Sequence, residues 1–253
     1  MSKVKKTFYR IERSEFGKKL RFALVSDLHG EDPQDVIQIL KEERPDHILC
    51  PGDIFERLDG SREAINENGF RLFEVIGTLA PTFFSVGNHE NGGVRSWNPG
   101  WKNRSLEKYY RPEDVERIKR AGVRFLDDGY VIEDGIAFGG FTSGLINEGN
   151  IPHTKWLEEF DGLDIPRVLL CHHPEYYKKY LSESKADLIV SGHAHGGQWR
   201  VFGRGVFAPG QGIFPKYTAG VHDGRFVISR GLKSGGKIPR IFNPREVVFI
   251  DVN

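Results

Sequence analysis

The chain has 253 residues, of which 38% are hydrophobic and 12% aromatic, which is enough to bury the core of one globular domain. Its 36 basic and 35 acidic residues nearly cancel, and this balance excludes a broad electrostatic field that would attract extended nucleic acid. Only two cysteines occur, Cys50 and Cys171, so no disulfide framework is implied. We expect both to be buried core thiols, which are compatible with a reducing cytosol.

No window is apolar for long enough to form a signal peptide or a transmembrane helix, so we expect a cytoplasmic protein without a transmembrane segment. Residues 1–19 are rich in Lys and Arg. A solvated basic arm is favoured over one that touches a membrane surface.

The first part of the chain repeats one pattern, an apolar strand followed by a polar loop and then a helix. Strands are expected at 7–12, 20–26, 46–50 and 82–86, and helices at 33–43 and 61–79, the latter with Ser61 as its N-cap. Because residues i and i+2 of a strand face the same way, Asp27 and His29 can point at one spot. The pattern predicts an α/β layered fold with ligands gathered at the C-terminal ends of strands.

The rhythm breaks at residues 91–110, which follow a candidate site loop directly and include Trp97 and Trp101. Long loops in compact domains are often functional. Two interpretations stay open, a lid or substrate wall and a surface loop whose tryptophans pack locally.

The second part of the chain predicts a second sheet. A helix is expected at 112–121, then strands at 123–126, 130–132 and 136–141, a short helix capped by Thr154, a strand at 167–171, a helix at about 175–181 and a strand at 186–190. Residues 199–253 predict β-hairpins that complete this sheet, with 247–251 as the last strand. No repeat or linker interrupts the sequence, so we expect one domain spanning 1–253.

Polar residues that can bind metal follow five of the apolar strands. They are Asp27, His29, Asp53, Asn88, His172, His193 and His195. The set contains oxygen and imidazole donors and no thiolate. It suits Mn, Fe, Zn or Co and does not resemble a thiolate zinc site. Seven donors are too many for one catalytic ion with open positions, but they suit two ions that share a carboxylate. Two ions about 3.5–4 Å apart can clamp the attacking and leaving oxygens of a phosphoryl displacement.

The order of these motifs resembles that of the calcineurin-like metallophosphoesterases. The matching blocks are Asp27-x-His29, Gly52-Asp53, Gly87-Asn88-His89-Glu90, His172-x-Pro174 and Gly192-His193-x-His195. The later Gly196-Gly197-Gln198 and Pro215-x-Tyr217-x-x-Gly220 are most similar to small bacterial single-domain phosphodiesterases of that superfamily. Some of those relatives carry an N-terminal membrane anchor, which we do not expect here.

The resemblance implies a four-layer αββα sandwich, with two mixed sheets flanked by helices and the site at the sheet ends. It also implies two transition-metal ions, with Mn, Fe or Zn favoured. Asp27, His29 and His195 would hold the first ion, Asn88, His172 and His193 the second, and Asp53 would bridge them. His173 is the alternative to His172, which the family spacing before Pro174 favours.

The resemblance further implies that His89 protonates the leaving oxygen or stabilises the charge of the transition state. Glu56 resembles the acid that orients this histidine, although Asp is usual there. Arg57 resembles a phosphate-binding arginine, and a surface arginine is the alternative. Trp97 and Trp101 are further candidates for contact with substrate.

The leading functional prediction is a phosphodiesterase in which a metal-bridging hydroxide attacks phosphorus in line. A phosphomonoesterase, a nuclease and a non-catalytic metal-binding interaction module of the same fold are the alternatives. The substrate is expected to be a phosphate-ester small molecule or a lipid-linked phosphate ester. Extended nucleic-acid binding is not expected, because the net charge is only +1.

Overall fold

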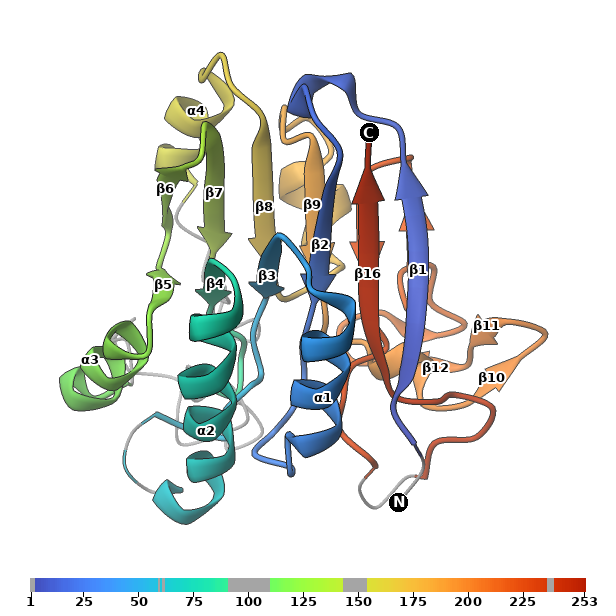
Figure 1. Ribbon diagram of the computed structural model, residues 1–253. Coiled ribbons are helices and arrows are strands. Elements are labelled where there is room, and N and C mark those ends of the chain that lie inside the picture. Colours follow the sequence, from blue (N-terminus) through green and yellow to red (C-terminus); the bar gives the residue numbers. More distant parts are fainter. Residues whose placement is uncertain (1–2, 59, 61, 91–109, 143–153, 236–238) are drawn as a thin grey trace, which may run out of the picture.

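The computed structural model describes residues 3–58, 60, 62–90, 110–142, 154–235 and 239–253. Two six-stranded mixed sheets form its centre (Figure 1). The first sheet has the order β1 (Lys5–Ile11), β16 (Glu246–Val252), β2 (Leu20–Leu24), β3 (His47–Cys50), β4 (Thr82–Ser85) and β5 (Val123–Leu126). The second has the order β14 (Gly220–His222), β15 (Phe226–Ile228), β9 (Leu188–Ser191), β8 (Arg167–Cys171), β7 (Ile136–Phe141) and β6 (Gly129–Glu133).

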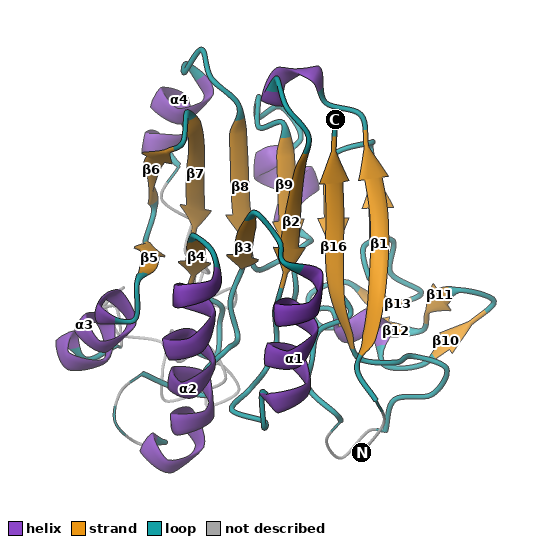
Figure 2. Cartoon of the chain, in the orientation of Figure 1, coloured by secondary structure: helices purple, strands orange, loops and turns teal. Residues whose placement is uncertain are grey.

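Helices cover the outer faces of the two sheets (Figure 2). The first sheet carries α1 (Gln34–Glu43), α2 (Glu63–Leu79) and α3 (Pro112–Arg120), and the second carries α4 (Lys155–Asp161) and the π-helix η5 (Tyr177–Leu181). Apolar side chains of both sheets meet between them, where the rings of Phe83 and Phe138 stack with centroids 3.7 Å apart. The arrangement is the mixed α/β fold with two mixed sheets that the sequence predicts.

Parallel pairing of β2, β3 and β4 places their carboxyl ends at one edge of the first sheet. Parallel neighbours need a crossover connection, and α1 and α2 supply the two that are required. In the second sheet β7, β8 and β9 are likewise parallel. Because the carboxyl ends of both parallel sets lie at the same end of the molecule, the loops after β2, β3, β4, β8 and β9 can meet (Figure 1).

Two strands lie in a different sheet from the one predicted. Residues 123–126 were expected in the second sheet, but β5 pairs with β4 at the edge of the first. Strand β16 was also expected there, but it lies between β1 and β2 in the first sheet. Residues Val247–Ile250 of β16 are fully buried, which needs a central position, and strand periodicity does not specify which sheet provides it.

The C-terminal region otherwise completes the second sheet only in part. Strands β14 and β15 join it, whereas β10 (Arg200–Val201) with β11 (Arg204–Gly205), and β12 (Phe207–Ala208) with β13 (Gly212–Ile213), form two separate hairpins. Short 3₁₀ turns occupy η1 (Ser14–Phe16) and η6 (His195–Gly197). Ser61 lies outside the described residues, and the residue before the first turn of α2 is Arg62. In the described part of the chain, no helix is both long and apolar enough to cross a membrane.

Candidate metal centre

Five loops at the shared sheet edge carry the predicted metal ligands. Asp27 and His29 follow β2, Asp53 follows β3, Asn88 follows β4, His172 follows β8, and His193 and His195 follow β9. Candidate ligand atoms of Asp27, His29 and His195 lie within 4.8 Å of one another, and so do those of Asp53, His172 and His193. The first group has the three residues expected for the first ion, and the second joins Asp53, the expected bridge, to two of the residues expected for the second ion.

Asp53 stands between the two groups. Its Oδ2 is 3.1 Å from Nε2 of His172 and 3.6 Å from Nε2 of His29. A carboxylate in this position has one histidine of each group in reach. That is the geometry a bridging ligand needs.

Five buried polar atoms of the predicted metal ligands have no hydrogen-bond partner. They are Oδ2 of Asp27, Nε2 of His29, Oδ1 of Asn88, Nε2 of His172 and Nε2 of His193. Buried polar atoms in folded proteins nearly always have a partner, so five such atoms at one edge need an explanation. All five are donor atoms that Mn, Fe or Zn accepts, and metal ions at this edge would satisfy them. The residues present therefore fit a metal centre.

The second nitrogens of two histidines are already engaged. Nδ1 of His172 donates to the carbonyl oxygen of Pro51 at 3.1 Å, and Nδ1 of His29 lies 3.1 Å from Oε1 of Glu56. Such bonds fix the tautomer and the ring orientation of a metal-binding histidine. In both residues the other ring nitrogen, Nε2, is turned toward Asp53.

The loops hold their polar side chains on left-handed backbone. Asp27, His29, Asp53, His193 and His195 have φ between 45° and 66°. This conformation is unfavourable for residues other than glycine, and it persists where the surroundings over-determine it. The constraints are bonds between loops: the backbone N–H of Asp27 donates to the Gly52 carbonyl, that of His29 to the Asp53 carbonyl, and that of His193 to Oδ1 of Asp27.

Glu90 holds two of these loops together, a role that the sequence did not reveal. Its buried carboxylate accepts four backbone N–H bonds of 2.7–2.9 Å, from Asp53, Ile54, Phe55 and Gly87. Burial, with the nearby Asp53 charge, raises the pKa of Glu90 to about 7 although these bonds oppose the shift. The residue belongs to the Gly87–Glu90 block, and its length, unlike that of Asp, lets it reach the loop after β3.

Two glycines leave the space that the carboxylates occupy. A Cβ on Gly87 would lie 2.2 Å from Oδ1 of Asp53, and one on Gly192 would lie 2.4 Å from Oδ2 of Asp27. Any side chain there would displace a candidate ligand.

His89 and Glu56 lie at the rim of the centre. Nδ1 of His89 is 3.0 Å from Oε2 of Glu56, and its Nε2 is 3.9 Å from Oδ2 of Asp53. Glu56 thus contacts both His29 and His89, and it also accepts a bond of 3.2 Å from Nζ of Lys233. Burial lowers the pKa of His89, but the Asp53 and Glu56 carboxylates outweigh it and raise the pKa above its usual value.

Burial sets the charge state of the remaining ligands. It lowers the pKa of His29 and of His193, and it brings the pKa of His195 to about 3, so these imidazoles are neutral near pH 7. Burial alone would raise the pKa of Asp53, but His172 and His89 bring it well below the usual value. Burial opposes a charged imidazole, but the Asp53 carboxylate raises the pKa of His172 to about 9. The neutral imidazoles of His29, His193 and His195 beside the ionised Asp53 are donors suited to cations.

His173 lies beside Glu175 and His193. Its Nδ1 is 3.2 Å from Oε1 of Glu175, which in turn is 3.9 Å from Nε2 of His193, and candidate ligand atoms of these three residues lie within 4.8 Å of one another. His172, which the motif spacing favours, has its Nε2 3.1 Å from Oδ2 of Asp53. Glu175, and Arg240 at 3.4 Å from Nδ1 of His195, are neighbours of the centre that only the fold brings there.

Of the predicted substrate contacts, only Arg57 lies within the described residues. Arg57 follows Glu56 and is partly buried, and among the described residues its guanidinium has no hydrogen-bond partner. Trp97 and Trp101, with the predicted lid at 91–110 apart from Tyr110, lie outside the described residues. Tyr110 packs against Phe125 and donates to Oδ2 of Asp127.

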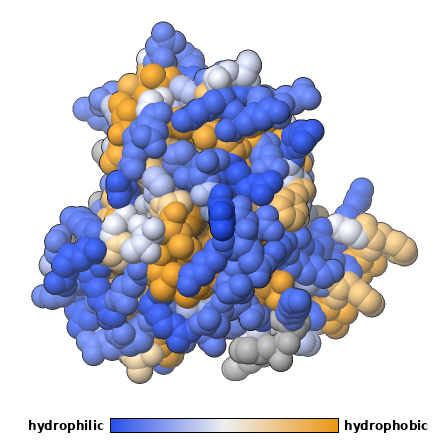
Figure 3. Space-filling view, viewed as in Figure 1, coloured by the Kyte–Doolittle hydropathy of each residue, from blue (hydrophilic) through white to orange (hydrophobic). Residues whose placement is uncertain are grey.

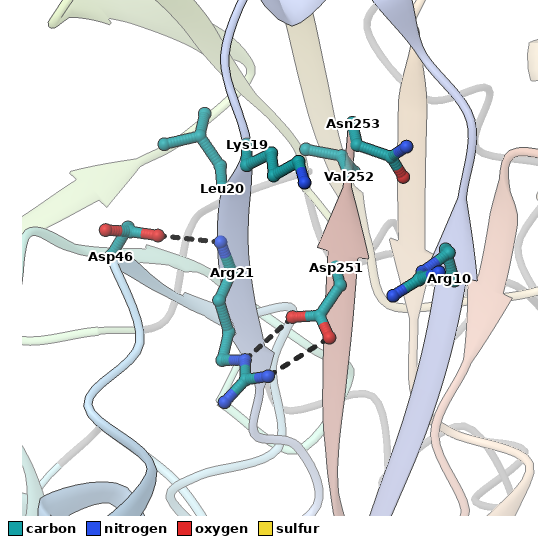
Figure 4. A pocket seen from close by; sticks show the side chains of 8 residues that line it. All are labelled: Arg10, Lys19, Leu20, Arg21, Asp46, Asp251, Val252 and Asn253. Carbon is teal, nitrogen blue, oxygen red and sulfur yellow. Dashed lines mark hydrogen bonds and ion pairs between the residues drawn. The ribbon is translucent and has the colours of Figure 1, made fainter.

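A separate pocket lies at the amino end of β2, opposite the candidate centre (Figure 4). It has a volume of about 340 Å³ and is lined by Arg10, Lys19, Leu20, Arg21, Asp46, Asp251, Val252 and Asn253. The Arg21 guanidinium is held by two bonds of 2.7 and 3.1 Å to the Asp251 carboxylate. Because Asp46 and Asp251 offset its cations, this pocket is not a strong anion site.

Comparison with known proteins adds three findings. A family model described as Calcineurin-like phosphoesterase matches residues 20–197. An uncharacterized metallophosphoesterase of Aquifex aeolicus (strain VF5) is 25% identical over 263 residues, covering 99% of this chain and 91% of that protein. Phosphodiesterase YaeI of Escherichia coli (strain K12) is 28% identical over 173 residues, covering 66% of this chain and 55% of that protein. A crystal structure of TT1561 of Thermus thermophilus has a TM-score of 0.47 and 14% identity over 69% of this chain and 82% of that chain, too distant a likeness to add to the argument.

Proposed function

The chain belongs to the calcineurin-like phosphoesterase family, and we propose that it is a dinuclear metal-dependent phosphodiesterase. The observation that carries the proposal is the position of Asp53 between two groups of ligands whose buried donor atoms lack partners. Asp27, His29 and His195 would hold one ion, and Asn88, His172 and His193 the other, with Asp53 shared. Manganese, iron and zinc suit this donor set best. When bound, such ions lower the pKa of water and withdraw charge from a phosphoryl group.

His89 is the proposed proton donor. Its Nδ1 is directed at Glu56, so the proton available to a leaving oxygen is on Nε2, which lies on the side of Asp53. The raised pKa of His89 keeps it protonated at higher pH than a free imidazole. Glu56 fixes the ring, and it also restrains His29. Proton delivery to the leaving group is a step that general acids accelerate by roughly 10²–10⁴-fold.

The substrate is proposed to be a phosphate-ester small molecule, with diesters favoured over monoesters. The related E. coli protein is named a phosphodiesterase, which supports this preference. Arg57, Trp97 and Trp101 are the proposed substrate contacts, and 91–110 the proposed lid of a domain spanning 1–253. A cytoplasmic location is also proposed, and it is supported by two buried free thiols, Cys50 and Cys171.

The test is Mn²⁺-dependent hydrolysis of a bis-nitrophenyl phosphodiester and of a nitrophenyl monoester, measured side by side. The wild-type protein should cleave the diester faster, and Asp53→Asn should abolish cleavage. Asp251→Asn is the matched control, because it removes a carboxylate at the opposite end of β2 and should leave activity unchanged. Faster monoester cleavage would replace the diesterase proposal with a phosphomonoesterase. Binding of two ions without any cleavage would favour a non-catalytic module.

A further inference from the structure

A large apolar surface projects beside the candidate metal centre. Eight exposed hydrophobic residues form this apolar platform: Trp199, Val201, Phe202, Phe207, Ile213, Phe214, Ile241 and Phe242. Phe202 is fully exposed, Phe242 is 86% exposed and Phe214 is 69% exposed. Figure 3 shows apolar residues over the projecting part of the molecule where Figure 1 places β10 and β11. Contiguous exposed apolar surface of this kind marks an interaction site.

Backbone contacts join the platform into one unit. Trp199 and Ile241 form a bridge, and the N–H of Arg200 donates to the Ile241 carbonyl at 3.0 Å. The N–H of Val206 donates to the Trp199 carbonyl at 2.9 Å, and that of Phe214 donates to the Val206 carbonyl at 2.8 Å. The two hairpins and the segment around Phe242 therefore present their apolar side chains from a common base.

Three phenylalanines of the platform occupy backbone positions that disfavour them. Phe202, Phe214 and Phe242 have φ of 49°, 50° and 52°. Phe202 and Gly203 form the two-residue loop between β10 and β11, where positive φ at both positions usually selects Asn-Gly. A bulky, fully exposed residue on left-handed backbone does not contribute to the stability of the fold. Such an outlier points to function.

The segments that form the platform carry a positive charge. Residues 199–216 and 239–242 include four basic residues, Arg200, Arg204, Lys216 and Arg240, and no acidic residue. The guanidinium of Arg200 bonds to the neutral carbonyls of Gly196 and Gly203. Because the whole chain has a net charge of only +1, this cationic character is local.

We propose that the apolar platform docks on the surface of a bilayer that contains anionic phospholipid. Aromatic side chains at projecting tips enter the boundary between headgroups and acyl chains, and neighbouring Arg and Lys attract anionic headgroups. A second copy of the chain is disfavoured as the occupant, since two such cationic surfaces would repel each other. The platform begins four residues after His195, and Arg240, the neighbour of Ile241, contacts that histidine. Docking therefore brings the bilayer surface next to the candidate metal centre.

The test is flotation of the full chain with large unilamellar vesicles of phosphatidylcholine alone, or with phosphatidylglycerol added. The triple variant Phe202→Asn, Phe214→Asn, Phe242→Asn is compared with the wild type. Asn suits left-handed backbone, so these changes preserve the turns. Ile132→Asn, which alters a residue 56% exposed on β6 away from the platform, is the matched control.

We expect the wild type and the control to float with anionic vesicles, and added salt to weaken the binding. The partition coefficient of the triple variant should be lower by at least about tenfold, because three phenylalanines no longer leave water. Equal binding of the wild type and the triple variant would overturn the proposal. So would failure of the wild type to bind anionic vesicles. Dimerisation of the wild type, abolished in the triple variant, would then identify the platform as a self-association surface, and binding only to an acidic protein would identify a protein partner. None of these binding measurements depends on catalysis.

Discussion

Eight of the thirteen left-handed residues other than glycine in the described part of the chain gather in two regions that differ in almost every other respect. In the candidate metal centre they are Asp27, His29, Asp53, His193 and His195, which are polar, largely buried and tied by bonds between loops. In the apolar platform they are Phe202, Phe214 and Phe242, which are apolar, exposed and placed in surface turns. Hydrogen bonds between loops stabilise the left-handed backbone of the first set, whereas the second set keeps an unfavourable conformation at the surface. Substitution should therefore lower stability or activity in the first region and raise stability in the second.

Among changes that keep every proposed metal ligand, the largest effect is expected for His89→Asn, which removes the proposed proton donor at the rim of the polar region. The kcat for the diester should fall by roughly 10²–10⁴-fold. Metal content, measured by elemental analysis, should stay at two ions per chain, because His89 is not a proposed ligand. His222→Asn changes a histidine of the C-terminal part and should leave kcat unchanged. Unaltered kcat in His89→Asn would remove this residue from the reaction.

A smaller loss is expected for Glu56→Gln, which keeps the shape of the side chain but removes its charge. We expect activity to fall by about 10–100-fold, as is typical for partners that orient ligands. The Glu56 carboxylate raises the pKa of His89, so without it His89 deprotonates at lower pH. The alkaline limb of the profile of kcat against pH should accordingly move to lower pH. Glu116→Gln on α3 is the control. An alkaline limb that stays at the same pH in Glu56→Gln would contradict its assignment to His89.

Glu90→Gln tests whether the network fixes the loops of the polar region. The amide NH₂ would face backbone N–H groups that now donate to the carboxylate, so buried donors would be left without acceptors. The free energy of unfolding should fall by about 1–3 kcal/mol in urea denaturation. Glu133→Gln removes an exposed partner of Arg124 and should change it by less than about 1 kcal/mol. Equal effects of the two changes would show that Glu90 does not hold the two loops together.

The smallest effect, and of opposite sign, is expected for Phe202→Asn in the platform. Asn accommodates left-handed backbone better than Phe, so the free energy of unfolding should rise by up to about 1 kcal/mol. The same measurement on Asp27→Asn should give no such gain, since that change replaces the carboxylate that accepts from the His193 N–H with a neutral amide. A loss of stability in Phe202→Asn would show that this phenylalanine contributes to folding, and the contrast between the regions would fail.

The sequence predicted the alternating part of the fold and the motif loops because both depend on local pattern. Apolar strands that end in Asp, Asn and His mark one sheet edge wherever parallel pairing holds. It did not predict that β16 inserts between β1 and β2, because strand periodicity indicates a buried strand without naming its neighbours. The π-helix η5, expected as an ordinary helix at about 175–181, is another detail that periodicity does not encode.

Within the candidate site, the motif residues that follow β2, β3, β8 and β9 were brought together as expected, but their supporting contacts were not foreseen. Glu90, Glu175 and Arg240 contact site residues through long-range packing that no motif describes. The apolar platform was also missed, because alternating residues in 199–253 predicted strands with one buried face. Exposure of both hairpins is a property of the tertiary structure.

The central claim, that Asp53 joins two metal-binding groups, is tested most directly by counting ions. Elemental analysis after loading with Mn²⁺ and desalting should give two ions per chain for the wild type and for Asp251→Asn. Asp53→Asn, checked for native circular dichroism, should retain one ion or none. One ion in the wild type, or two ions held equally well by the wild type and Asp53→Asn, would contradict the account.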